Sequence, residues 1–514
     1  MSGVISESIH KNGNIERSNS ITTENTVRAT SDDISVSIEK KEETLNNEQI
    51  VEDKIDLKKS NPVWKFWKKD DLKSDPRLFS PMKKRLILLT VAFATSTAPI
   101  SSTIYLPALV EIQYAFNTTA TIVNTSLSVF VFTDAIFPLL WAPFGDLFGR
   151  RRIYLISFLI NIIGCIGCAL SVNVGMFIAF RAISAMGSSS VVSMGAGTLS
   201  DIYDAHERGR ALSLYALAPL LGPAIAPIIG GYMNESLGWH SIFYFIAGYG
   251  AVVWLCILFF LPETWRPQMK LPGSELEKKS TLLGLLKQVN PLGSLRFLRF
   301  GNIALCCAFS GINFLMFYLL NATFSRTYTL VYGFSSGTVG LCFLPLAFGG
   351  IIGSTVGGRL VDRFYNKACA KTGGEGTPEM RINLKVLSIA MFFQVSAMIA
   401  YGWCVYKRVH EAWGLICIFF LAIGLLIPTV TIQTYIVDCF RSSSASVTAC
   451  INFVRYILGG VGALVATDLQ VALGDGVLYT ICGGISGSML IAIVFLKLKQ
   501  ARWQNVRENL KTGL

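Results

Sequence analysis

One carboxylate lies in the middle of a long apolar stretch and has the clearest potential for chemistry. Asp134 sits about halfway along an apolar span that begins near Thr121, whereas the other acidic residues of the apolar regions lie at or beyond the ends of their spans. If this span crosses a bilayer, a charge there costs roughly 2.5–3.5 kcal/mol, so the side chain should face a partner or a cavity. Asp134 can hold a proton or a cationic group, or it can form a structural pair with an arginine.

Arg181 is the second candidate, about two turns inside the outer edge of the fourth apolar span. An arginine at this depth commonly faces a cavity and has a carboxylate nearby. Its long side chain can also reach the membrane surface, which is the structural alternative. We expect Asp134 and Arg181 to form the site that couples protons to substrate.

The composition indicates the kind of element that positions these residues. The 514 residues are 52% hydrophobic and only 15% charged, with a mean hydropathy of +0.50. Soluble proteins carry about 25% charged residues. Successive apolar stretches are each long enough to cross roughly 30 Å of hydrocarbon. The sequence therefore predicts an all-α membrane protein.

The apolar spans fall into two groups of six, so we predict twelve transmembrane helices in two six-helix halves. The first two spans run from about Leu86 to Leu106 and from about Ile122 to Phe144. The others are centred near Ile162, Ser188, Pro223, Val252, Phe314, Ala347, Gln394, Leu421, Ala449 and Ser486. The predicted parts are a disordered cytoplasmic tail (1–80), the first half (81–264), a cytoplasmic linker (265–299), the second half (300–497) and a C-terminal tail (498–514).

The net charge of +12 follows the membrane topology. Lys and Arg cluster beside the spans on one side, and the opposite loops contain only Arg326, Lys407 and Arg408 as strong positives. This positive-inside pattern places both termini in the cytoplasm and gives no reason to expect nucleic acid as a partner. The sequence shows no metal-ligand pattern, no phosphate-binding loop and no catalytic triad. We therefore expect neither an enzyme, nor a metal site, nor a cofactor.

A charged motif follows the second span and is repeated in weaker form in the second half. The chain reads Ala142-Pro-Phe-Gly-Asp146-Leu-Phe-Gly149-Arg150-Arg151 in the first half and Gly358-Arg-Leu-Val-Asp362-Arg363 in the second. This resembles the loop motif of the major facilitator superfamily, with Ala142 and Phe144 in place of a glycine and a leucine. The resemblance implies a cytoplasmic latch formed by Asp146, Gly149, Arg150, Arg151, Asp201, Asp362 and Arg363.

The fifth span contains a proline–glycine pattern. Its residues are Gly222, Pro223, Pro227, Gly230 and Gly231. The prolines remove backbone donors and the glycines allow close helix approach. The pattern is similar to the antiporter motif of the superfamily, with Ala226 in place of one glycine, and this similarity implies export. Read as helix packing alone, the pattern says nothing about direction.

Leu261-Pro-Glu-Thr264 and Asn452-Phe-Val-Arg455 are further family-like signatures. The closest resemblance is to the fungal twelve-spanner drug:proton antiporters, in particular the quinidine-resistance, polyamine and dityrosine exporters. It implies a proton-coupled antiporter that acts as a monomer and exports small molecules across the plasma membrane, or across a vacuolar or spore membrane. An importer, a uniporter and a non-transporting receptor are the alternatives. Candidate polar contacts to substrate are Asn313, Gln394, Thr431 and Gln433.

Overall fold

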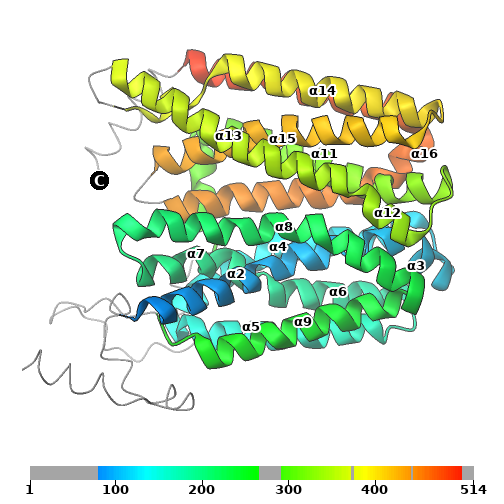
Figure 1. Cartoon of the computed structure of the whole chain (residues 1–514), viewed down its shortest axis with the longest axis horizontal. Coiled ribbons are helices and arrows are strands. Elements are labelled where there is room, and N and C mark those ends of the chain that lie inside the picture. Colours follow the sequence, from blue (N-terminus) through cyan, green and yellow to red (C-terminus); the bar gives the residue numbers. More distant parts are fainter. Residues whose placement is uncertain (1–78, 265–290, 372–375, 441–443, 500–514) are drawn as a thin grey trace, which may run out of the picture. The chain divides into compact units, whose positions relative to one another are not determined.

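The computed structural model describes residues 79–264, 291–371, 376–440 and 444–499. Residues 1–78 of the tail predicted to be disordered, residues 500–514 of the predicted C-terminal tail, and most of the predicted linker lie outside the described residues. Long helices run alongside one another through the described part of the chain (Figure 1). In the first half they are α2 (Pro81–Thr103), η4 (Leu106–Ala108), α3 (Leu109–Ala115), α4 (Ala120–Phe148), α5 (Arg150–Ala169), α6 (Val174–Ser188), α7 (Ser190–Ile202), α8 (Ala205–Leu237) and α9 (Trp239–Phe260).

The second half follows the same plan. Its elements are η5 (Pro291–Arg299), α11 (Gly301–Leu330), α12 (Ser336–Cys342), α13 (Leu344–Lys371), η6 (Pro378–Arg381), α14 (Leu384–Tyr406), α15 (Glu411–Cys439) and α16 (Ser444–Leu498). Eleven helical stretches in the described residues are long and apolar enough to cross a membrane. The last, in α16, is broken at Gly474, whose φ of 72° is accessible to glycine at little cost. Because this break divides α16 into two passes, the prediction of twelve apolar helices is confirmed.

The bundle has two ends, which we name by one residue each. At the Arg150 end, α2 and α5 begin and α13 finishes; at the Glu235 end, α8 finishes and α12 begins. Short local signals set these termini. The Ser80 hydroxyl caps α2, and Gly149 with φ of 92° separates α4 from α5.

The buried apolar side chains form three clusters with different positions along the bundle. The largest combines residues of both halves near the Glu235 end, for example Leu109 and Ile246 with Leu320 and Tyr401. The other two lie towards the Arg150 end, and each contains residues of one half only. The two halves therefore share a core at the Glu235 end and have separate cores at the Arg150 end.

Candidate functional site

Asp134 lies fourteen residues from each end of α4, which places it at the middle of the helix as expected. Its side chain is only 6% exposed, and its Oδ1 is enclosed without a hydrogen-bond partner. It forms no ion pair with another residue of the described ranges, although Arg181 is close enough to act on it electrostatically. A buried carboxylate without a fixed partner can take up a proton or a cationic group.

Arg181, on α6, is 1% exposed and held by backbone and aromatic rings. Its Nη1 donates a 3.0 Å hydrogen bond to the carbonyl of Ser101, while its Nε and Nη2 have no partner. The guanidinium carbon lies 4.3 Å from the ring centre of Tyr105 and 4.2 Å from that of Phe130, distances at which cation–π attraction operates. Phe130 is one helical turn before Asp134, so Arg181 lies beside α4 on the Glu235 side of the carboxylate.

The motif after α4 is assembled around Arg150. Its Nη1 lies 2.6 Å from the carboxylate of Asp201, and its Nη2 lies 3.9 Å from the more exposed Asp146. The backbone N–H of Arg150 donates to Glu263, which thereby caps the first turn of α5. Gly149 is required because a Cβ there would lie 2.5 Å from the Glu263 carboxylate. The structure thus brings Asp146, Arg150 and Asp201 together, and Glu263 is a partner that the sequence did not predict.

Arg151 connects α5 to α9, because its Nη2 donates a hydrogen bond to the carbonyl of Leu258 near the end of α9.

The second half has an equivalent cluster built on another arginine. Arg381, at the end of η6, donates to Asp438 through its Nε and to Asp362 through its Nη1. Partial burial works against the charged guanidinium, but the two carboxylates raise the pKa of Arg381 above its usual value. Arg363, which was expected in the latch, makes no ion pair within the described residues. Arg381 was missed although it precedes the third span of its half, as Arg150 does.

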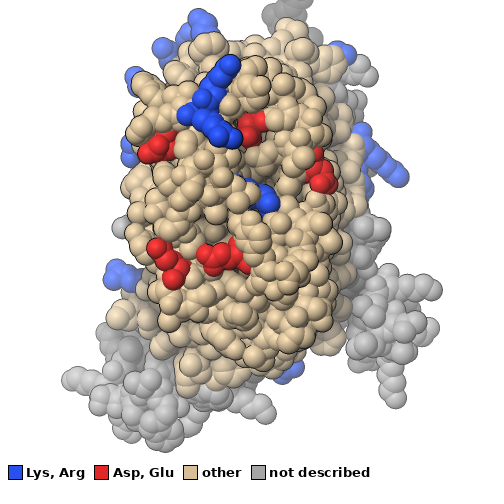
Figure 2. Space-filling model, turned by 90° about the vertical axis from the view of Figure 1, so that its right-hand side faces the viewer, with Lys and Arg blue, Asp and Glu red and all other residues tan. Residues whose placement is uncertain are grey.

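Hydrogen bonds between the two halves cluster at the Glu235 end. Asn124 donates to Thr467 at 2.7 Å, and Arg326 donates to Gln113 at 2.7 Å. Glu235 accepts from the backbone N–H of Gly337 at 3.0 Å. Figure 2 shows the face at this end, which is mostly uncharged with a few separated acidic and basic side chains. These bonds and the shared core join the halves at this end of the bundle.

The proline–glycine pattern of α8 also helps to join the two halves at the Glu235 end. A Cβ on Gly230 would lie 1.7 Å from the backbone oxygen of Ile104, and one on Gly231 would lie 2.3 Å from that of Ser336. Gly222 likewise packs against α2. Pro223 and Pro227 lie inside α8, and the backbone of Pro227 closely approaches Gly340 of α12. The pattern therefore permits close contact of α8 with α2 in its own half and with α12 in the other half.

The four polar candidates of the second half are not gathered at Asp134. Gln394 donates a 2.7 Å hydrogen bond to the buried Asn313, while its own Oε1 is enclosed without a partner. Thr431 bonds to the carbonyl of Ile427 in its own helix, and Gln433 is exposed. A contact with substrate remains a prediction for all four.

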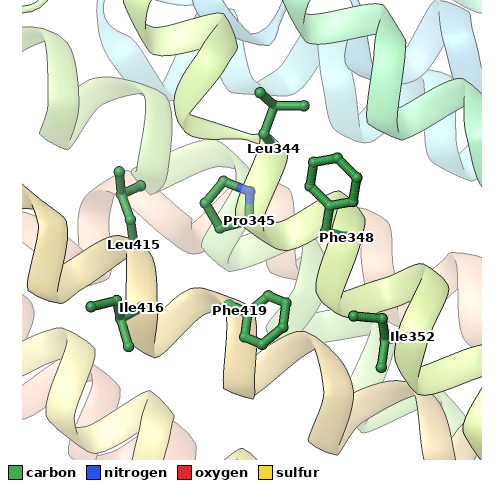
Figure 3. A pocket seen from close by; sticks show the side chains of 7 residues that line it. All are labelled: Leu344, Pro345, Phe348, Ile352, Leu415, Ile416 and Phe419. Atoms are coloured by element: carbon green, nitrogen blue, oxygen red, sulfur yellow. The ribbon is translucent and has the colours of Figure 1, made fainter.

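Two further features of the described residues offer no site for chemistry. No group of three or more His, Cys, Asp or Glu side chains there is placed to hold a metal ion. A groove of about 500 Å³ lies between α13 and α15 on the outside of the bundle. Figure 3 shows its apolar lining, formed by Leu344, Pro345, Phe348, Ile352, Leu415, Ile416 and Phe419.

Comparison with solved structures shows the fold. A bacterial homologue of the human lysosomal transporter Spinster, in an inward-facing and unoccupied conformation, matches with a TM-score of 0.62 at 16% identity, covering 84% of this chain and 98% of that one. A D-xylose–proton symporter matches with a TM-score of 0.61 at 14% identity, covering 80% and 97%.

Sequence comparison identifies the family. A model of the Major Facilitator Superfamily matches residues 91–463. The chain is 30% identical to the MFS transporter cpaT of Aspergillus oryzae, covering 82% of this chain and 88% of that protein. It is 27% identical to the MFS antiporter QDR3 of Candida albicans (83% and 79% covered) and 28% identical to citrate exporter 1 of Aspergillus niger (84% and 88% covered). The chain therefore belongs to the Major Facilitator Superfamily, among transporters of the fungal drug-efflux type.

Proposed function

We propose that this transporter is a proton-coupled antiporter that exports small organic molecules, such as drugs, polyamines or related metabolites, by alternating access. The observation that carries the proposal is Asp134, a buried carboxylate at mid-helix without a hydrogen-bond partner for Oδ1. Such a group is costly in a membrane unless it binds something during the working cycle. Alternate binding of a proton and a substrate group at Asp134 accounts for its position.

The distribution of charge supports an orientation with the Arg150 end in the cytoplasm. Lys83, Lys84, Arg150, Arg381 and Lys497 are among the basic residues at that end. The Glu235 end has far fewer, and basic residues beside membrane helices favour the cytoplasmic side. We place both termini in the cytoplasm and the transporter in the plasma membrane.

The direction of transport is supported by similar proteins, whose names include an antiporter, an efflux pump and a citrate exporter. The halves are joined at the Glu235 end, so we infer an inward-facing state in which substrate enters from the cytoplasm. Each proton that later moves inward contributes about 2.3 kcal/mol per 100 mV of membrane potential. The Arg150 and Arg381 clusters must rearrange when the halves rock.

The test is efflux of quinidine, spermidine, a weak acid and a tyrosine dimer from cells that express the wild type or Asp134→Asn. Each measurement is made with and without a proton uncoupler, and Asp134→Glu serves as the variant that keeps the carboxylate. We expect uncoupler-sensitive efflux in the wild type, its loss in Asp134→Asn, and partial retention in Asp134→Glu.

Other outcomes identify the alternatives. Efflux that is unchanged in a well-expressed Asp134→Asn variant contradicts the coupling role. Uncoupler-sensitive accumulation inside the cell indicates an importer, and uncoupler-insensitive flux indicates a uniporter. No flux of any probe, with normal localisation, favours the receptor.

A further inference from the structure

Three acidic or basic side chains lie well inside the membrane helices of the described residues, away from the charged clusters at both ends. They are Asp134 on α4, Arg181 on α6 and Arg455 on the first pass of α16. The proposed function uses Asp134, and Arg181 is fixed by Ser101 and two aromatic rings. Arg455 remains unexplained, and a charge at this depth needs an anionic or polar partner.

The surroundings of Arg455 are aromatic rather than acidic. Its guanidinium carbon lies 4.4 Å from the ring centre of Phe314 and 5.1 Å from that of Tyr456. Its Nε is enclosed and makes no hydrogen bond, and no carboxylate of the described ranges pairs with it. The side chain is nevertheless partly exposed. Apart from its hydrogen bond with the Tyr456 side chain, the Arg455 guanidinium can still donate to a carboxylate, a group that it binds with well-matched geometry.

Close packing of α16 on α4 brings Arg455 near Asp134 of the other half. A Cβ on Gly460, five residues after Arg455, would lie 2.5 Å from the ring of Phe132, two residues before Asp134. Tyr318 and Tyr456 lie in the same region, since each is within electrostatic range of both charged side chains. Their rings pack edge-on against Phe314, with ring centres 5.4 Å apart in both pairs. An anionic centre on one half and a cationic centre on the other therefore share an aromatic wall. This arrangement matches a molecule with two opposite charges on an apolar or aromatic body.

The position of Arg455 agrees with loading from the cytoplasm. It lies eleven residues after Ser444, the start of α16 at the Arg150 end, which is roughly 16 Å along the helix. Asp134 is deeper, and the halves are joined beyond it by Asn124 and Thr467. A substrate that enters at the Arg150 end reaches Arg455 before Asp134.

We infer that Arg455 and Asp134 bind the two ends of an amphoteric substrate, with its carboxylate on Arg455 and its ammonium group on Asp134. The exported class is then amino acids or amino-acid derivatives with an aromatic or apolar body. This inference rests on the proposed function, because the ammonium group competes with the proton at Asp134. This substrate class is narrower than organic cations in general, because a purely cationic substrate has no group that Arg455 could bind.

The test measures equilibrium binding of matched probes to the full-length protein in lipid nanodiscs. One set shares a single body: L-phenylalanine has both charges, 3-phenylpropanoate only the carboxylate, and 2-phenylethylamine only the ammonium group. A second set separates the charges further: the dipeptide Phe-Phe, its N-acetyl form and its C-terminal amide. We expect the doubly charged probe of at least one set to bind tenfold or more tightly than its singly charged analogues.

Two variants divide the site. Arg455→Gln should weaken binding of the doubly charged probe and of the acid at least tenfold while leaving the amine unchanged. Asp134→Asn should weaken binding of the doubly charged probe and of the amine while leaving the acid unchanged. Arg455→Lys and Asp134→Glu keep each charge and should retain most of the affinity. If the neutral variants fail to fold, the test rests on the wild type alone, that is, on whether the doubly charged probes bind more tightly than their singly charged analogues.

The outcomes separate this inference from the proposed function. Doubly charged probes that bind no more tightly than their analogues in either set, or unchanged affinities in folded Arg455→Gln, overturn the inference. If amines alone bind and still exchange for protons, the proposed antiport stands without the Arg455 site. If binding follows the expected pattern but efflux ignores an uncoupler, the Arg455 site stands and the proposed coupling fails.

Discussion

Asn124 of α4 donates a 2.7 Å hydrogen bond to the hydroxyl of Thr467 on α16, and both side chains are buried. One turn away, Thr121 donates to the carboxylate of Asp468 at 2.6 Å. These two contacts join helices of opposite halves at the Glu235 end. Because the halves must part there for substrate to leave, the two bonds contribute directly to the balance between the two states.

Removal of the Asn124 bond should shift this balance towards opening at the Glu235 end. A buried hydrogen bond contributes about 0.5–1.5 kcal/mol, so Asn124→Ala should change the ratio of the two states about two- to tenfold. The populations of the two states can be measured from distances between spin labels by electron–electron double resonance. The labels are placed at Tyr114 and Val471, which are both strongly exposed at this end. The control is Thr480→Val, which removes a bond to Trp403 within the second half. An equal shift in both variants contradicts a specific role for Asn124.

Hydropathy and motif spacing were sufficient to predict the helices and much of the first-half cluster. Asp134 is at mid-helix because its span has apolar residues on both sides, and Arg150 meets Asp201 because both lie at span ends on one side. These positions depend on distance along the helix axis, which residue numbers give directly.

Side-chain partners between helices were harder to predict. Gln394 donates to Asn313 across α14 and α11, two helices whose apolar residues extend all round. Periodicity in such helices does not indicate which face meets a neighbour. The partner of Asp362 depended on the path of the chain between α13 and α14, so the sequence placed the adjacent Arg363 in the latch and did not identify Arg381. A comparison of the two halves could have identified Arg381, because Arg150 and Arg381 each precede the third span of their half.

Asp201 should matter more than Asp146 for the Arg150 cluster. Asp201 lies 2.6 Å from the guanidinium and is half as exposed as Asp146, which lies 3.9 Å away. Water weakens the longer, more exposed contact. We expect Asp201→Asn to lower the maximal efflux rate several-fold more than Asp146→Asn does, at matched expression. Equal losses in the two variants indicate that Asp146 acts through contacts made in another state.

Close approach of α8 to α2 makes Gly230 intolerant of any side chain. A Cβ there meets the backbone oxygen of Ile104, which cannot move aside as a flexible side chain can. Overpacking of this kind costs about 1–3 kcal/mol, so Gly230→Ala should lower the thermal unfolding midpoint of the detergent-solubilised protein. Gly248→Ala is the matched control, because no atom lies within 4 Å of a Cβ at that position. A midpoint for Gly230→Ala equal to that of the control would show that α8 moves away easily.

Arg381 and Arg363 offer a direct comparison in the second half. Arg381 joins Asp362, nine residues before the end of α13, to Asp438 at the end of α15, whereas Arg363 pairs with no carboxylate of the described residues. Removal of the Arg381 charge leaves two acidic groups facing each other without their shared cation, and their repulsion should separate the helix ends. We expect Arg381→Gln to lower both the thermal midpoint and the efflux rate, and Arg363→Gln to leave both near wild-type values. The double variant Arg381→Gln with Asp438→Asn should recover stability, since it removes one of the two carboxylates that repel each other. If Arg363→Gln alone abolishes efflux while stability is kept, Arg363 forms its latch contact in the state that is closed at the Arg150 end.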